Sequence, residues 1–524
     1  MRALLFETKY PRTDRGWPRW SAPKSIRVEV DMPQHHRDVV VIGAGISGLV
    51  CAYRLKTLGV DVALLEKSDR AGGVIQTERV GGYLIERGPN SSQGTEELVA
   101  LVEELGITDE LADGDPKAPA YVYFKGRLHA VPSGAGAFIK SKLLSFAGKL
   151  RIFKEPFVAA RRSDEEESVA AFARRRIGRE AAELLVAPFV SGIYAGDAEQ
   201  LSVQAAFPKL ANLETGYGGL FRGAFAKARE ARRARKSAGA VLDKAAPKRR
   251  RLCSFKSGMA FLPNTIASRL GEDLITESEG LRIEERPEHP EPNEIPQSNE
   301  NPQSAIRNPQ WKRFSIDFDR NGNHHQLTCN ELVIATPANV ASLLVASTSD
   351  ELSGLLKEIE YPPLAIVSLS YDESAVATPL DGFGFLVPPS ERMNVLGCVW
   401  NTSLFEDRAP HGKALLTVFI GGARNPAAAR LADDDLVSTA HRELRQVLGI
   451  STDPEVVAIT RYERSIPQYN LGHFARVQRI EHLLRELPGL RLIGNYMHGV
   501  STGDCIKEAD RTAREIAGSL TGSR

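Results

Sequence analysis

The stretch VVVIGAGISGLVCAYRLKTLGVDVALLE, residues 39–66, constrains the fold of this chain more than any other feature. Residues 38–42 have the β-branched, apolar composition of a strand that is buried on both faces. Three glycines follow as G-x-G-x-x-G, a spacing that permits a tight turn, close approach of a pyrophosphate and close packing of helix on strand. Residues 47–58 carry apolar side chains at helical spacing, and residues 60–65 resemble a second strand. The segment therefore predicts a dinucleotide-binding βαβ unit.

An acidic residue closes the second predicted strand. Glu66 lies 18 residues after Gly48, where a carboxylate can accept hydrogen bonds from ribose hydroxyls. Its charge disfavours a 2′-phosphate, so NADP is not expected at this site. An isolated G-x-G-x-x-G is often an ordinary glycine turn, but strand, helix, strand and acid all follow here in register. NAD and FAD both remain open at this point.

The length and charge of the chain limit how many domains it can form and which partners it can bind. A chain of 524 residues is too long for one compact core, so two or three domains are expected. The net charge is only +1, but residues 227–251 contain 11 Lys or Arg against Glu230 and Asp243. This basic segment suits a solvated helix and loop, or a surface that meets anionic lipid. Nucleic acid is not expected, because no aromatic interleaving or recognised binding motif accompanies the charge.

The five cysteines and the termini indicate the compartment. The cysteines are odd in number and scattered without C-x-x-C, so we predict no structural disulfide, no metal site and a cytoplasmic location. No uninterrupted apolar run is long enough to span a membrane, and the N-terminus lacks the apolar core of a secretory signal. Residues 1–31 show no periodicity and are interpreted as a disordered extension or as the product of an upstream start codon.

Several further segments have a clear local pattern. Residues 96–105 and 168–177 have helical apolar spacing, and residues 137–162 mix Phe, Ile and Leu with Lys and Arg. That mixture suits a membrane interface and equally a lid over a substrate, so both interpretations stay open. The repeat NEIPQS-NENPQS predicts a disordered insertion at the tip of a hairpin. Further elements are expected as strands at 281–285, 311–319, 331–338, 365–371 and 414–420, and as helices at 435–448 and from 503 onward.

The residues after Glu66 decide between the cofactors. Arg70, Gly72 and Gly73 extend the pattern to E-x-x-x-R-x-G-G, which resembles the fingerprint of the amine-oxidase-like flavoproteins, so FAD is expected. Later motifs resemble more specifically the oxygen-dependent protoporphyrinogen oxidases. These motifs are GPNS at 88–91, SGIYAGDAEQLSV at 191–203, SFKSGM at 254–259, DGFGFLVP at 381–388, VLGCVWNTSLF at 395–405, IPQYNLGH at 466–473 and GNYMHGVSTGDCI at 494–506.

The resemblance implies an α/β fold: a GR2-type Rossmann-like FAD-binding domain with a mixed-sheet substrate domain and an inserted helical domain. The expected division is residues 1–35 as a disordered extension; 36–95, 250–337 and 466–524 as the discontinuous FAD-binding domain; 96–215 as the helical domain, with a membrane-associating role left open; 216–249 as a basic helix and loop; 286–310 as the disordered insertion; and 338–465 as the substrate-binding domain.

The resemblance also implies which residues form the site. The residues implied for cofactor binding are Gly43, Ala44, Gly45, Ile46, Ser47, Gly48, Glu66, Lys67, Arg70, Gly72, Gly73, Gly88, Pro89, Asn90, Gly494, Asn495, Gly499, Val500 and Ser501. The residues implied for substrate binding are Gly192, Phe383, Gly384, Leu386, Val399 and Phe419. The helix starting near Gly503 and Asp504 would stabilise, through its N-terminal N–H groups, the negative charge that reduction places on the flavin.

The implied reaction is oxidation of protoporphyrinogen IX to protoporphyrin IX, with oxygen as acceptor and hydrogen peroxide as product. No catalytic side chain is assigned, because flavin N5 would take the hydride; His473 and Asn495 are polar candidates nearby, and His473 is interpreted as structural. Gln93 stands where some members of the family have an arginine that pairs with a substrate propionate. This departure leaves coproporphyrinogen III open as the substrate. A non-catalytic flavin-binding partner protein, a haem-pathway partner enzyme, a homodimer and peripheral contact with the inner face of an anionic membrane also stay open.

Overall fold

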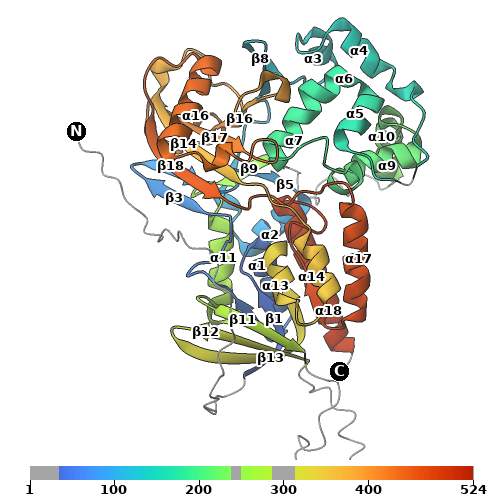
Figure 1. The fold of residues 1–524 in the computed structure, drawn as a ribbon, viewed down its shortest axis with the longest axis vertical. Coiled ribbons are helices and arrows are strands. Elements are labelled where there is room, and N and C mark those ends of the chain that lie inside the picture. Colours follow the sequence, from blue (N-terminus) through green and yellow to red (C-terminus); the bar gives the residue numbers. More distant parts are fainter. Residues whose placement is uncertain (1–34, 164, 238–249, 286–312, 523–524) are drawn as a thin grey trace, which may run out of the picture.

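The computed structural model describes residues 35–163, 165–237, 250–285 and 313–522. Within these residues the chain forms two seven-stranded sheets and a body of helices (Figure 1). In Figure 1 the first sheet occupies the lower half of the molecule, and the second sheet and the helical body lie above it. The expected disorder of residues 1–35 and 286–310 falls, apart from residue 35, outside the described residues.

The first sheet contains the predicted dinucleotide-binding unit. Its strand order is β10–β2–β1–β13–β12–β11, and β19 pairs with β13. β1 runs parallel to β2 and β13, and β12 runs antiparallel to β11 and β13. The predicted hairpin around the insertion is therefore confirmed in its two strands. The strands are β1 (His35–Ile42), β2 (Val62–Leu65), β10 (Leu274–Ile275), β11 (Glu279–Glu285), β12 (Phe314–Arg320), β13 (Asn323–Ile334) and β19 (Leu490–Leu492).

Helices cover both faces of the first sheet, as the continuous apolar run of β1 predicts. Val39 and Val41 are buried in the core on one face, and Val40 and Ile42 are buried in the core on the other. Since parallel strands covered on both faces need apolar side chains at every position, the sequence does not alternate here. The first face carries α1 (Ile46–Thr57), α2 (Glu96–Leu105), α11 (Phe261–Leu270) and α18 (Thr502–Gly522), and the second carries α13 (Ala338–Leu344), α14 (Asp350–Lys357) and α17 (His473–Glu486).

The second sheet has the order β18–β14–β17–β16–β15–β7–β8 and is antiparallel except where β15 runs parallel to β7. One face packs against α16 (Asp433–Leu448), with Trp400 fully buried in that core. Its strands are β7 (Ala120–Phe124), β8 (Arg127–Ala130), β14 (Leu364–Asp372), β15 (Gly384–Leu386), β16 (Val395–Trp400), β17 (Lys413–Gly421) and β18 (Glu455–Tyr462).

Two small sheets and one short helix connect these bodies. β3 (Thr77–Val80) and β4 (Tyr83–Glu86) form a hairpin, and β9 (Arg250–Phe255) pairs with both β5 (Ser92–Gly94) and β6 (Leu111–Asp113). The helix α15 (Asn401–Leu404) follows β16 directly. The small sheets thus join the segment after Glu66 to the middle of the chain.

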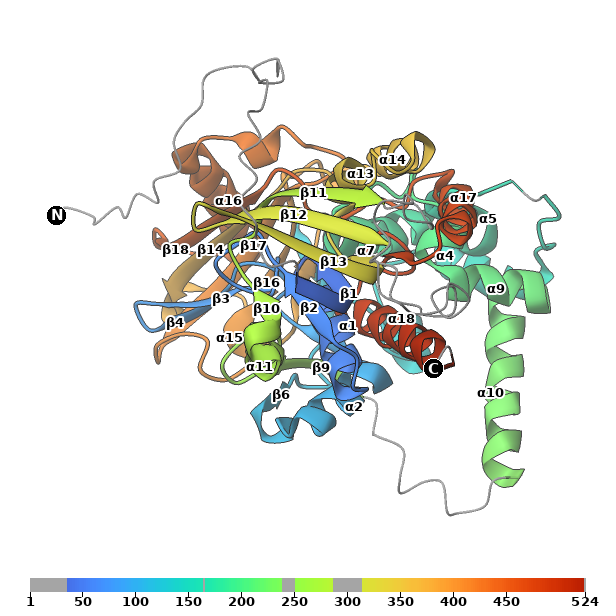
Figure 2. The same cartoon turned by 90° about the horizontal axis from the view of Figure 1, so that it is seen from below.

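The helical body begins after β8. Serine side chains cap three of its helices: Ser145, Ser168 and Ser202 each accept a hydrogen bond from a backbone N–H in the first turn. Seen from below, α10 extends away from the rest of the molecule (Figure 2). The helices are α3 (Ala135–Lys140), α4 (Phe146–Phe153), α5 (Val169–Ile177), α6 (Arg179–Ala181), α7 (Ala187–Tyr194), α8 (Val203–Ala206), α9 (Pro208–Tyr217) and α10 (Leu220–Ser237).

The expected fold class is confirmed, but two boundaries differ from the prediction. Residues 96–215 are not one helical domain: α2 packs in the first core, and β7 and β8 extend the second sheet. Residues 338–357 were assigned to the substrate domain, yet α13 and α14 cover the first sheet. The helix at 96–105 was predicted, but its packing partner was not, because that partner lies far away in sequence; β7, β8, α13 and α14 were not predicted as elements. The basic helix of segment 216–249 is α10, and residues 238–249 lie outside the described residues.

Candidate active site

The glycine turn between β1 and α1 has the geometry that a pyrophosphate requires. Gly43 has φ +101°, in the left-handed region that favours glycine. A Cβ on Gly48 would overlap the carbonyl oxygen of Gly43, so only glycine lets the helix pack this closely on the turn. A Cβ on Gly45, in contrast, would meet no protein atom within 4 Å. The backbone N–H groups that begin α1 are therefore accessible to an anion.

Glu66 lies beside this turn, as predicted. Its Oε2 accepts a hydrogen bond from the backbone N–H of Ala44 at 2.7 Å, and its Oε1 accepts one from the N–H of Ser68 at 2.9 Å. The carboxylate is thus fixed at the end of β2, where a ribose would follow the pyrophosphate. Lys67 is exposed next to it.

The loop that carries Gly72 and Gly73 folds back onto the glycine turn. The N–H of Gly72 donates to the carbonyl of Ala44 at 2.8 Å. The guanidinium of Arg70 donates to the carbonyl of Gly73 and to the side chain of Gln76, both at 3.0 Å. Arg70 therefore stabilises the shape of the loop.

The C-terminal motif returns to the same place. The residues between β19 and α18 form a loop, and two hydrogen bonds anchor this loop to Tyr469. The Tyr469 hydroxyl donates to the carbonyl of Asn495 at 2.6 Å and accepts from the N–H of Gly499 at 2.9 Å. Tyr469 is buried, and its ring stacks on His473 with centroids 4.2 Å apart. This tyrosine lies within the motif IPQYNLGH, but no role was predicted for it.

Two helix N-termini converge at this loop. α18 packs along α1, and the Cys505 thiol contacts the Ser47 side chain, so the helices begin side by side. The start of α18 is capped by Ser501, whose Oγ accepts from the N–H of Asp504 at 3.1 Å. A pair of N-terminal dipoles favours negative charge in the space before them. This is the electrostatic environment that a pyrophosphate and a reduced flavin ring both need.

An unpaired polar atom supports this fit. Thr336 follows β13, and its methyl group would lie 3.0 Å from a Cβ on Gly43. Its buried hydroxyl has no hydrogen-bond partner among the described residues. Buried polar groups are rarely left without a partner, so a ligand with polar atoms is expected beside the turn. The residues present therefore fit FAD.

The six predicted substrate residues form one surface. On the face of the second sheet opposite α16, cross-strand pairing creates two neighbouring rows, Gly384–Val399–Thr417 and Leu386–Gly397–Phe419. Phe383 packs with Val399 and Phe419. Gly192, on α7, lies so close to Leu386 that a Cβ there would overlap its side chain. We call Gly192, Phe383, Gly384, Leu386, Val399 and Phe419 the apolar wall.

The other polar candidates, His473 and Gln93, are not part of the apolar wall. His473 is 1% exposed, and burial lowers the pKa of its imidazole to about 4, so the ring is neutral and structural, as interpreted from the sequence. Gln93 lies on β5 with its side chain exposed. Three buried groups were missed by the sequence analysis: Asn401, Thr417 and Arg408. The three residues share no motif, and their contacts arise only when distant segments of the chain pack together.

Arg408, in the loop between α15 and β17, belongs to a buried pair that joins this loop to β4 and β9 of the two small sheets. Its guanidinium donates to the Ser254 hydroxyl at 3.0 Å and lies 4.0 Å from the carboxylate of Glu86. Glu86 accepts from the Thr77 hydroxyl at 2.6 Å and from the N–H of Met259 at 2.8 Å. Burial outweighs these contacts and raises the pKa of the Glu86 carboxyl to about 7.

This shift makes stability depend on pH. A raised pKa stabilises the fold fully below the unfolded value near 4.5, and the contribution is lost as the pH rises through about 7. Relative to Glu86→Gln, the wild-type free energy of unfolding should therefore fall by about 3 kcal/mol between pH 4.5 and 7.5. Chemical denaturation across this range measures the difference. Glu78→Gln, on the exposed neighbouring strand, is the control, and parallel wild-type and Glu86→Gln profiles would contradict the assignment.

Comparison with known proteins identifies the class that this geometry indicates, a flavin-dependent oxidoreductase. The chain belongs to the flavin-containing amine oxidoreductase family, whose profile matches residues 46–517. The expected cofactor, FAD, and the expected enzyme class are thereby confirmed.

Two named relatives and one solved structure show which enzymes of this family the chain resembles. The chloroplastic protoporphyrinogen oxidase of Nicotiana tabacum is 34% identical over 510 residues, covering 93% of this chain and 87% of that protein. The coproporphyrinogen III oxidase of Bacillus subtilis is 28% identical over 495 residues, covering 91% and 97%. The fold matches a crystal structure of a candidate protoporphyrinogen oxidase from Exiguobacterium sp. 255-15, with a TM-score of 0.72, 24% identity and coverage of 93% and 100%. The resemblance inferred from the motifs is confirmed.

Proposed function

We propose that the protein oxidises protoporphyrinogen IX to protoporphyrin IX, with FAD as the bound oxidant and oxygen as the final acceptor. The observation that carries the proposal is the apolar wall, which shares its sheet face with Thr417 and adjoins the segment of Asn90. A flat, apolar tetrapyrrole suits such a surface. The 34% identity to the tobacco enzyme supports the same substrate class.

The chain's own residues bind and orient rather than exchange protons. None of the six residues of the apolar wall carries a titratable group. FAD, when bound, would supply hydride acceptance, and the apolar wall would hold and orient the flat ring of the substrate. The overall reaction balances as protoporphyrinogen IX plus three O₂ giving protoporphyrin IX plus three H₂O₂.

Coproporphyrinogen III is the second candidate substrate. The similarity to the Bacillus subtilis enzyme favours it, and the absence of an arginine at position 93 leaves the choice of substrate open. Gln93 offers no charge to a propionate. Without a cation at this position, the two propionates of protoporphyrinogen IX are easier to leave in water than the four of coproporphyrinogen III. Protoporphyrinogen IX therefore remains the first choice.

An anaerobic experiment tests the proposal. Purified, FAD-loaded protein is mixed with protoporphyrinogen IX without oxygen, and the flavin absorbance near 450 nm is followed. We expect the flavin to bleach within one turnover and to recover on admission of air, with hydrogen peroxide formed. A flavin that stays oxidised would contradict the proposal and would favour a non-catalytic flavin-binding protein.

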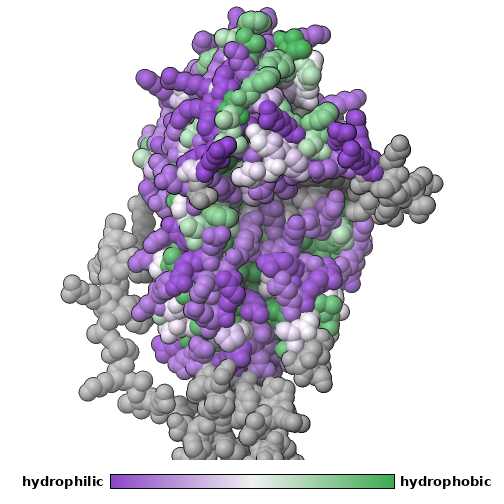
Figure 3. Space-filling model, turned by 90° about the vertical axis from the view of Figure 1, so that its right-hand side faces the viewer, coloured by the Kyte–Doolittle hydropathy of each residue, from purple (hydrophilic) through white to green (hydrophobic). Residues whose placement is uncertain are grey.

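We also propose that the helical body rests on an anionic membrane surface, which makes the protein peripheral rather than spanning. Among the described helices, none combines the length and apolar character needed to cross a bilayer. Phe146 and Phe157 are 83% and 84% exposed, and Ile139, Leu150 and Phe153 are exposed nearby. Hydrophobic surface gathers at the upper end of the molecule in Figure 3, the end where Figure 1 places α3 and α4.

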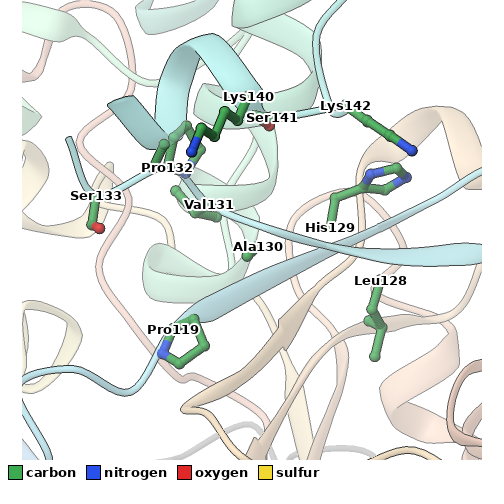
Figure 4. Close-up of a pocket in the computed structure, with 11 residues that line it drawn as sticks. Pro119, Leu128, His129, Ala130, Val131, Pro132, Ser133, Lys140, Ser141 and Lys142 are labelled. Atoms are coloured by element: carbon green, nitrogen blue, oxygen red, sulfur yellow. The ribbon is translucent and has the colours of Figure 1, made fainter. Parts of the chain in front are cut away.

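Cationic side chains border this surface. A pocket of about 380 Å³ lies between β8 and α3, and its lining includes His129, Lys140 and Lys142 (Figure 4). The ammonium of Lys149 donates to the carbonyl of Ser141 at 2.6 Å and fixes the segment between the two lysines of the pocket. Exposed aromatic residues beside lysines are the combination that binds phospholipid interfaces.

Vesicle sedimentation tests this contact. Wild-type protein should sediment with phosphatidylglycerol-containing vesicles and much less with phosphatidylcholine alone. Phe146→Ser combined with Phe157→Ser should weaken binding about tenfold, because two aromatic side chains no longer enter the interface. Leu343→Ser changes an equally exposed residue on α13 and should leave binding unchanged. Equal binding of the double variant and the wild type would contradict the proposal.

A further inference from the structure

A chain of three buried polar side chains connects the apolar wall to the proposed cofactor segment. The Thr417 hydroxyl, on β17, donates to Oδ1 of Asn401 at 2.8 Å. The amide nitrogen of Asn401, at the start of α15, donates to Oδ1 of Asn90 at 2.8 Å. The three residues are 2%, 5% and 9% exposed. We call them the Asn90–Asn401–Thr417 relay.

The relay determines which way the Asn90 carboxamide faces. Because its oxygen accepts from Asn401, its amide nitrogen points away from Asn401 and remains available as a donor. This nitrogen has no hydrogen-bond partner among the described residues. Asn90 Nδ2 is not among the buried atoms without a partner, so it reaches a space open to solvent and can donate to a ligand acceptor that replaces water there.

The surroundings of Asn90 indicate where that acceptor lies. Asn90 directly follows Gly88 and Pro89, and a Cβ on Gly88 would overlap the carbonyl oxygen of Val74, so this loop is held tightly against the segment after Gly73. At its other end the relay reaches Thr417, which pairs with Val399 in the apolar wall. The free amide nitrogen therefore lies at the junction of cofactor segment and wall.

We propose that Asn401 and Thr417 are positioning residues that fix the Asn90 carboxamide so that its N–H donates to an acceptor of the bound flavin ring. The pyrrole nitrogens of a porphyrinogen carry hydrogens and are donors, so they are poor partners for an N–H group. In the oxidised flavin ring, N1, N5 and the two carbonyl oxygens are acceptors. The inference rests on the proposed function only through FAD, and not through the identity of the substrate.

The hydroxyl of Thr417 gives the sharpest test. Thr417→Val keeps the shape of the side chain but leaves Oδ1 of Asn401 unpaired, so both amides become free to rotate. We expect the dissociation constant of FAD from the reconstituted apoprotein to rise about fivefold and the visible flavin spectrum to shift. Thr417→Ser restores the hydroxyl and should return both measurements to wild-type values. Asn401→Leu should act at least as strongly, and the double variant with Thr417→Val should add nothing to it, because both changes break the same relay.

Ser370→Ala is the matched control. Ser370 is buried on the same sheet and its hydroxyl donates to the Tyr83 hydroxyl at 2.9 Å, so this change also removes a buried hydrogen bond without touching the relay. It should leave FAD affinity and spectrum unchanged. An unchanged flavin in Thr417→Val, or an equal change in Ser370→Ala, would overturn the proposal. A wild-type protein that binds FAD but oxidises no porphyrinogen would overturn the proposed function and leave the relay supported by these measurements.

Discussion

Replacing Gly48 with alanine should yield a protein that is purified without FAD. The added Cβ would overlap the carbonyl oxygen of Gly43 and would lie 3.2 Å from the side chain of Ala335. Both contacts come from residues that directly follow the central strands β1 and β13, and the overlap at Gly43 is with backbone, so the turn must open and the N-terminus of α1 must move. We expect FAD affinity to fall more than about a hundredfold, or about 3 kcal/mol.

Flavin absorbance per mole of purified protein measures this effect directly. Gly354→Ala is the control, because Gly354 lies in α14 and an added Cβ would meet no atom within 4 Å. The control should retain full flavin content. A Gly48→Ala protein with stoichiometric FAD would show that the turn does not hold the cofactor.

Arg176→Met should destabilise the helical body by about 3–5 kcal/mol. Arg176 is fully buried and pairs with Glu155, which is also fully buried, and with Glu214. Its guanidinium also donates to the carbonyl of Val158 at 3.0 Å. Removing the cation leaves the buried carboxylate of Glu155 without its ion-pair partner, whereas Glu214 keeps its pair with Arg175. The uncompensated charge of Glu155 causes most of the loss.

Urea denaturation provides the measurement, and a neighbour on the same helix provides the control. Arg174 is also on α5 and pairs with Glu199, but both side chains are nearly half exposed. Arg174→Met should cost less than about 1 kcal/mol. Similar losses for the two variants would indicate that helix propensity, rather than the buried ion pairs, determines the stability of α5.

The first βαβ unit was predicted almost to its boundaries. The expected helix at 47–58 is Ile46–Thr57, and the expected strand at 60–65 is Val62–Leu65. These elements are determined by local periodicity and by glycines whose conformations few other residues adopt. Glu66 was placed correctly for the same reason, since its position follows from the length of the unit.

Assignment to a sheet could not be predicted in the same way. The turn at Lys125 and Gly126, both with positive φ, marks a hairpin that the sequence analysis missed inside the expected helical domain. Even with the hairpin recognised, its pairing with β15 depends on residues more than 250 positions away. Neither composition nor periodicity carries that information.

The residues of the candidate site also fall into those that could be predicted from the sequence and those that could not. The residues of the apolar wall came from the motif resemblance, and the strand register explains why they share one face. Asn401 lies in the motif at 395–405 and Thr417 in an expected strand, but their shared role could not be predicted, because they form a relay only when α15 and β17 meet the Asn90 loop. Tyr469 likewise gains its role from two backbone groups that lie at least 26 residues away.

Steady-state oxidation of two porphyrinogens is the measurement that tests the account most directly. FAD-loaded protein in air is supplied with protoporphyrinogen IX and, separately, with coproporphyrinogen III, and porphyrin fluorescence gives kcat/KM for each. We expect a clearly larger kcat/KM for protoporphyrinogen IX, with one hydrogen peroxide formed for each pair of electrons. Preference for coproporphyrinogen III, or no turnover of either substrate by a protein that carries its flavin, would contradict it.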